Sequence, residues 1–311
     1  MGLRFVISLI ISSISIAAAQ TDQAQAPRIS APYSDEIRKL SAQGLRVKEA
    51  IEINIDGPAG NLAVVFERTK PRAPNESYEF RIFERGNSSV TTIFRRADFF
   101  FSFPPNEVTR LNASDFNGDG FKEIVVQSSS GGNCWSCNPT EIYRVKNHTA
   151  ELIGAAPIER IVDLDGDGKA ELLVTDARWE VYSDLSHAAA PSSVMIYAWR
   201  NGKYVYASRD FSSYCESEID RLKGEIAQAR AQITNQEFSD DGFVGRSLSL
   251  AITRAHQGFV ERAIGELQNL LNSNVISKEQ QKRRAAILED FKSGASAKKL
   301  RQMKYGDPLP F

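Results

Sequence analysis

Two kinds of hydrophobic pattern divide the chain near residue 211. Between residues 45 and 211, short apolar runs are separated at close spacing by Gly, Pro, Asn and Asp, which is typical of β-strands joined by turns. The runs predict strands at 47–54, 62–68, 78–84, 90–95, 108–113, 123–128, 141–145, 150–153, 160–164, 171–175, 194–200 and 204–208.

After residue 211 the apolar positions recur every three or four residues, which predicts amphipathic helices. The first helix is expected at 213–234, and a second helical stretch at 244–271 is interrupted by Gly258. Ser277 and Gln280 have the spacing of a capping box at the start of a third helix, 278–292. The expected fold class is therefore α+β multidomain: an all-β domain over residues 45–211, a small helical bundle over 212–305, and a tail at 306–311.

An internal repeat lies within the β region. Residues 163–174 (DLDGDGKAELLV) repeat residues 115–126 (DFNGDGFKEIVV) 48 positions later. Positions 1, 3, 5 and 9 of each copy carry side-chain oxygens: Asp115, Asn117, Asp119 and Glu123 in the first, and Asp163, Asp165, Asp167 and Glu171 in the second. Calcium takes about six to eight oxygen ligands, and tight turns favour the glycines found here. The spacing predicts two Ca²⁺ loops that lead into strands.

A third, degraded copy covers residues 52–65, where position 9 is Gly60, and we expect no metal there. The copies define three blade-like modules, fewer than the roughly four to eight blades of a propeller. Strand 47–54 lacks a module and the third module lacks a fourth strand. Pairing between strand 47–54 and the third module would close the modules into a small ring. The alternative is an open array of three sheets.

The motif D-x-[DN]-G-D-G-x-x-E-[IL]-x-V resembles the FG-GAP or VCBS-type repeat of exported proteins and integrin-like β-propellers. The resemblance implies that each loop joins the last strand of one blade to the first strand of the next. It also implies that the eight side chains above bind calcium together with the backbone carbonyls of Phe121 and Lys169. The family usually has Asp at position 9, where both copies here have Glu.

Two other known motifs share features with parts of the chain. An EF-hand would need a bidentate acid at position 12 and helices on both sides, whereas Val126 and Val174 occupy that position and strands flank the loops. Residues 258–270 resemble the middle of a tetratricopeptide helix pair, but only one such unit is present.

The N-terminus has the pattern of a secretory signal peptide. Arg4 precedes an apolar run at 5–16 and three alanines at 17–19. The run is shorter than the about 20 residues that span a bilayer, so we expect cleavage after Ala19, a flexible leader at 20–44, and a secreted or periplasmic protein with no transmembrane segment after cleavage. Residues 278–304 are basic, but a solvated helix face explains them and no nucleic acid partner is expected.

Cys134 and Cys137 form a C-x-x-C motif with three interpretations. A redox-active pair needs a helix N-terminus at the first Cys, and a zinc site needs about four ligands. Pro139 and a following strand, with no second C-x-x-C, favour a local disulfide that presents Trp135. Cys215 is expected to be a buried thiol at a helix start, with pairing to either of the other two as the alternative.

Aromatic residues in two long loops are the candidates for partner binding. Trp135, Trp179 and Tyr182 would form an exposed patch for a protein or carbohydrate if both loops share one rim, or their rings would cover the ends of the sheets. The three histidines lie in unrelated contexts and no nucleophile elbow is present. The expected function is an exported, calcium-stabilised, non-enzymatic binding protein. The alternatives are an exported hydrolase acting on polysaccharide or phosphoester, and a structural subunit of an envelope assembly.

Overall fold

The computed structural model describes residues 29–56, 59–70, 78–99, 110–127, 134–137, 139–182, 185–233, 240–273, 277–302 and 304–309. The expected signal peptide and the first part of the leader lie outside these residues. The rest of the leader is not flexible as expected, because residues 31–42 form a helix with Tyr33 and Leu40 buried. Within the described ranges, no helix is both long enough and apolar enough to cross a membrane.

The β region consists of three four-stranded antiparallel sheets, as far as the described residues show. The first sheet contains β1 (Leu45–Asp56), β2 (Ala59–Arg68), β3 (Tyr78–Arg85) and β4 (Val90–Phe99). The second contains β5 (Arg110–Ser114), β6 (Glu123–Gln127), β7 (Thr140–Lys146) and β8 (Thr149–Ala156). The third contains β9 (Ile158–Val162), β10 (Glu171–Thr175), β11 (Val194–Arg200) and β12 (Lys203–Tyr206). Within each sheet, strands that are consecutive in the chain pair with each other.

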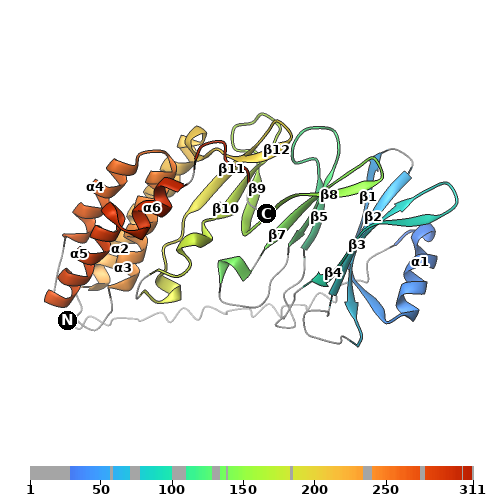
Figure 1. The fold of residues 1–311 in the computed structure, drawn as a ribbon, viewed down its shortest axis with the longest axis horizontal. Helices are drawn as coiled ribbons and strands as arrows, with labels where there is room; N and C mark the ends of the chain where they lie inside the picture. The colour runs from blue at the N-terminus through green and yellow to red at the C-terminus, as the bar shows by residue number, and fades with distance from the viewer. Residues whose placement is uncertain are drawn as a thin grey trace, which may run out of the picture.

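The sheets stand side by side in a row, with α1 (Ala31–Ala42) beyond the first sheet and the other helices beyond the third (Figure 1). This arrangement explains the continuous apolar runs that follow each acidic loop. Ile124 and Val126 belong to the core shared with the first sheet, whereas Val125 belongs to the core shared with the third. Because successive side chains of a strand point to opposite faces, a sheet that is covered on both faces needs apolar residues at every position.

The module boundaries inferred from the sequence are wrong by one strand. The strand before each acidic loop pairs with the strand after it, with Ser114 opposite Glu123 and Val162 opposite Glu171. Each loop is therefore a hairpin connection inside one sheet and does not join two blades. The fourth strand of the third sheet is β9, and β1 pairs with β2. Among the described residues, no ladder connects the first sheet to the third.

The C-terminal region is helical, as expected. It contains α2 (Ser212–Ile233), α3 (Asp241–His256), α4 (Val260–Leu271), α5 (Lys278–Ser293) and α6 (Ala295–Gln302). Gly258, with φ of +93°, makes the turn between α3 and α4. The capping box of Ser277 and Gln280 is present. The short helix α6 was not predicted.

The tail returns to the β region. The backbone N–H of Tyr206 donates to the Asp307 carbonyl at 2.7 Å, and the N–H of Leu309 donates to the Tyr204 carbonyl at 3.0 Å. Leu309 is buried in the core between the second and third sheets. The tail thus lies along the edge strand β12 and stabilises the contact between these sheets.

Candidate metal centre

The two acidic loops occupy equivalent places in neighbouring sheets. Loop 1 (residues 115–123) connects β5 to β6, and loop 2 (residues 163–171) connects β9 to β10. Gly166 and Gly168 in loop 2 have φ of +78° and +84°, a conformation that side chains with a Cβ disfavour. Each loop ends on a buried Glu, the first residue of its following strand.

Backbone N–H groups fix the carboxylates of loop 2. The two carboxylate oxygens of Asp163 accept hydrogen bonds from the N–H groups of Gly166 at 2.7 Å and Gly168 at 3.0 Å. Glu171 Oε2 accepts one from the Leu164 N–H at 2.9 Å. Three carboxylate oxygens, one from each of Asp163, Asp165 and Glu171, lie within 4.8 Å of one another.

The electrostatic environment of loop 2 favours a cation. Burial, reinforced by the charges of Asp165 and Asp167, raises the pKa of Glu171 to about 7. Desolvation acts to raise the pKa of the exposed Asp163, but hydrogen bonds from the Gly166 and Gly168 N–H groups hold it below its ordinary value. Loop 2 therefore combines an ionised carboxylate with a buried one whose charge is poorly compensated.

Loop 1 has the same backbone course but a different internal bonding pattern. The amide Nδ2 of Asn117 donates to Glu123 Oε1 at 2.7 Å, and the Phe116 N–H donates to Glu123 Oε2 at 2.9 Å. Burial also raises the pKa of Glu123 to about 7. Within the described part of the chain, the acids of loop 1 do not gather as closely as those of loop 2.

The residues of loop 2 fit a hard divalent cation. All of its side-chain donors are carboxylate oxygens, and the nearby positive group is Lys169, whose Nζ lies 3.5 Å from Asp167 Oδ2. Calcium prefers such a donor set, whereas zinc and copper favour nitrogen or sulfur ligands. Loop 1 fits less well because Asn117 already donates a hydrogen bond to Glu123.

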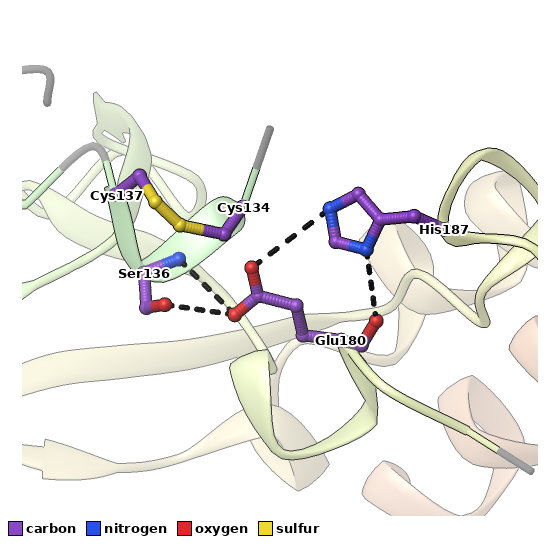
Figure 2. Close-up of a disulfide and its surroundings, with 5 residues drawn as sticks. All are labelled: Cys134, Ser136, Cys137, Glu180 and His187. Carbon is purple, nitrogen blue, oxygen red and sulfur yellow. Dashed lines mark hydrogen bonds and ion pairs between the residues drawn. A yellow bond between two sulfur atoms is a disulfide. The ribbon is translucent and has the colours of Figure 1, made fainter. Parts of the chain in front are cut away.

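The C-x-x-C motif forms a disulfide, as favoured from the sequence. Cys134 and Cys137 are bonded across a single turn of 3-10 helix, η2 (Trp135–Cys137). Ser136 Oγ donates to Glu180 Oε2 at 2.8 Å, and His187 Nδ1 lies 3.2 Å from the Glu180 carbonyl oxygen (Figure 2). The disulfide turn of the second sheet therefore docks on the long loop of the third. Cys215 is a buried free thiol near the start of α2, as expected.

The exposed aromatic patch is not present. Trp179 is fully buried and Tyr182 is 5% exposed. The Trp179 ring stacks on Phe291 of α5 at 5.5 Å, and Tyr182 OH donates to Asp290 at 3.2 Å. Both side chains belong to the helical core, so this loop anchors the helices to the third sheet. Trp135 keeps part of its surface exposed and lies 6.4 Å from the His187 ring.

The structure also brings together four buried polar residues that no sequence pattern links. His256 Nε2 lies 3.3 Å from Asp176 Oδ2 and 3.5 Å from Ser193 Oγ, and Nδ1 lies 2.8 Å from Tyr206 OH. A catalytic relay needs the acid and the serine on opposite ring nitrogens, whereas here they share one. These residues therefore tie α3 to the third sheet, and no sequence signal connects positions so far apart.

No protein-family model matches the chain, and no curated protein sequence matches it. The function must therefore be inferred from the loops and their geometry.

Proposed function

We propose that the protein is an exported, calcium-stabilised binding protein without catalytic activity, built on β-repeats of the FG-GAP/VCBS type. The observation that carries this proposal is the convergence of Asp163, Asp165 and Glu171 on one small volume. Carboxylates held this close repel one another when ionised, and a bound divalent cation removes that repulsion.

The proposed role of the ion is structural. Loop 2 is a hairpin connection inside the third sheet, and its last ligand is also the first residue of the buried strand β10. Calcium bound there would fix the start of β10. The loop has no imidazole, thiol or hydroxyl side chain, which supports a structural ion over a catalytic one.

Calorimetric titration of the full mature chain with CaCl₂ tests this role. We expect binding heat and a rise in Tm on the order of 5 °C at a calcium concentration about 100 times Kd. Absence of heat, together with equal Tm values in millimolar calcium and in EDTA, would rule out a calcium-stabilised protein.

Export is supported by the N-terminal pattern of residues 1–19 and by the disulfide, which persists in oxidising compartments. Fractionation of cells that express the full-length chain tests it. The expected form is a mature protein that begins near Gln20 and lies outside the cytoplasm. Uncleaved protein in the cytoplasm would contradict export.

The partner is proposed to be a protein or a carbohydrate. With Trp179 and Tyr182 buried, Trp135 is the aromatic loop residue left to contact it. Capture from an envelope extract, with and without EDTA, should be lost in Trp135→Ala. It should be retained in the matched variant Phe259→Ala, which removes a ring that is 51% exposed in the helical region. Equal capture by both variants would exclude Trp135 as the contact.

A further inference from the structure

The two acidic loops contact each other directly. The backbone N–H of Ala170 in loop 2 donates to the carbonyl of Phe116 in loop 1 at 2.6 Å. Gly118 of loop 1 faces the Lys169 side chain so closely that a Cβ at Gly118 would lie 3.2 Å from Lys169 Cγ. The loops are therefore one packed unit, although they belong to different sheets.

The hydrogen bond between the loops involves one particular peptide group. The N–H of Ala170 and the carbonyl of Lys169 belong to the same peptide plane, and the carbonyl of Lys169 is the expected backbone ligand of loop 2. In a trans peptide the N–H and the C=O point in opposite directions, and the described chain has no cis peptides. Because loop 1 holds the N–H, the Lys169 carbonyl is directed away from loop 1. The same bond polarises that carbonyl and strengthens it as an acceptor.

A second contact joins the two sheets beside loop 1. Arg144 of β7 lies opposite Glu123, the last residue of loop 1, in the ladder between β6 and β7. Its guanidinium carbon lies 4.7 Å above the ring of Trp199 in β11 of the third sheet. A displacement of loop 1 would therefore be transmitted to the third sheet by the Arg144–Trp199 contact as well as by the backbone hydrogen bond.

Loop 1 is also stiff enough to act as a support. The carboxylate of Asp115 accepts hydrogen bonds from the N–H groups of Gly118, Asp119 and Gly120, at 2.8, 3.2 and 3.0 Å. On the other side of the loop, the Asn117 amide donates a hydrogen bond to the Glu123 carboxylate. The equivalent N–H of Lys122 in loop 1 finds no backbone acceptor among the described residues. Among the described residues, the backbone bond from Ala170 to Phe116 therefore has no counterpart at the equivalent position of loop 1.

We propose that loop 1 positions the Lys169–Ala170 peptide of loop 2, so that calcium binds loop 2 more tightly while loop 1 is intact. This inference rests on the proposed binding of calcium at loop 2. Phe116 and Asp115 are positioning residues in this scheme, and neither needs to touch the ion in loop 2. By linkage, an ion in loop 2 stabilises the folded form of loop 1 to the same extent.

Calorimetric calcium titration of the full mature chain tests the inference. Asp115→Ala removes the acceptor of three loop 1 N–H groups and changes no residue of loop 2. We expect Kd at loop 2 to rise about tenfold, within the usual range of couplings between sites. Glu261→Ala removes an exposed acid from α4, outside the three sheets, and it should leave Kd within about twofold, which controls for the loss of one negative charge.

Hydrogen exchange supplies a second readout that does not depend on how Asp115→Ala folds. Calcium should slow exchange at Gly118 and Gly120 in the natural sequence. It should no longer do so in Asp165→Asn, which removes one of the three clustered carboxylates of loop 2. An unchanged Kd in Asp115→Ala would overturn the coupling. Slowed exchange in loop 1 that persists in Asp165→Asn would do so as well, because loop 1 would then respond to an ion of its own. If the natural sequence shows no calcium binding at all, the proposed function fails and not merely the coupling.

Discussion

Loops 1 and 2 share a motif and differ in what stands at its third position. In loop 1 the amide of Asn117 donates a hydrogen bond to buried Glu123. In loop 2 the equivalent residue is Asp165, a carboxylate that raises the pKa of Glu171 instead of donating to it. Loop 1 therefore gives its buried acid a side-chain hydrogen bond that the buried acid of loop 2 lacks, and a third-position carboxylate adds negative charge beside Glu171 that a cation would stabilise. The comparison shows that two copies of one motif can differ in the hydrogen bonding of their buried acid, and it predicts that they differ in calcium affinity.

The largest expected effect is the loss of calcium binding in Asp163→Ala. Asp163 contributes a charged oxygen to the cluster and holds the N–H groups of Gly166 and Gly168. Its removal should weaken calcium binding on the order of 100-fold, since ligand charge largely sets calcium affinity. Calorimetric titration measures this, with Asp115→Ala as the matched change in loop 1 and an expected effect about ten times smaller. Equal losses in the two variants would remove the distinction between the loops.

Placing the third-position residue of each loop in the other, Asp at 117 and Asn at 165, should reverse the calcium responses of the two loops. Asn117→Asp removes the donor to Glu123 and adds a fourth carboxylate to loop 1, so it should destabilise the calcium-free protein by about 1–3 kcal/mol. Calcium should recover much of that loss. Asp165→Asn should stabilise the calcium-free protein and reduce its response to calcium. Urea unfolding in EDTA and in calcium measures both changes, and a calcium response that Asn117→Asp leaves unaltered would contradict this assignment.

The pH dependence of stability separates the two buried acids. In the calcium-free protein the pKa values of Glu123 and Glu171 rise from the ordinary 4.5 to about 7. Between these values the folded state holds protons that the unfolded chain has released, so the free energy of unfolding should fall as pH rises from about 4.5 to about 7. Glu123→Gln and Glu171→Gln should each flatten part of this slope.

Calcium should change only one of these contributions. In excess calcium the ionised form of Glu171 is favoured, and only the contribution of Glu123 to the slope should remain. Urea unfolding across this pH range, repeated in calcium, measures it. If calcium flattens the slope completely in the natural sequence, Glu123 also binds the ion.

The smallest effect on calcium affinity is expected from the disulfide. The disulfide turn follows β6, whereas loop 1 precedes that strand, so the two lie at opposite ends of the second sheet. The double variant Cys134→Ser/Cys137→Ser should lose at most about 2 kcal/mol of stability, because the closed ring is short. Its calcium Kd should stay within about twofold of the natural value. A larger change would mean that the two ends of the sheet are coupled.

Features that depend on residues close together in the sequence were predictable. The positions of the strands, the capping box at Ser277 and the buried thiol of Cys215 all agree with the structure. The assignment of β9 to the second module was wrong. A repeated sequence can be divided into modules starting at any of its strands, and the pairing of Val162 with Glu171, which places β9 in the third sheet, is visible only in the structure. The same limit applies to the candidate site: the motif identifies both loops, but not the hydrogen bond that distinguishes them.

Contacts between distant residues were beyond the sequence patterns. Trp179 looked like an exposed loop aromatic because its stacking partner, Phe291, lies in a helix near the other end of the chain. The contact between Asp176 and His256 joins β-region and helix in the same way. Neither pair is marked by periodicity or spacing. The short helix α6 follows Gly294 directly, and its eight residues are too few to show a reliable period.

A crystal structure grown in calcium, with an anomalous difference map, tests the central claim most directly. We predict a peak that contacts Asp163, Asp165 and Glu171, with a weaker peak or none in loop 1. A peak in loop 1 with none in loop 2, or no peak in either loop at saturating calcium, would contradict the assignment of loop 2 as the calcium site.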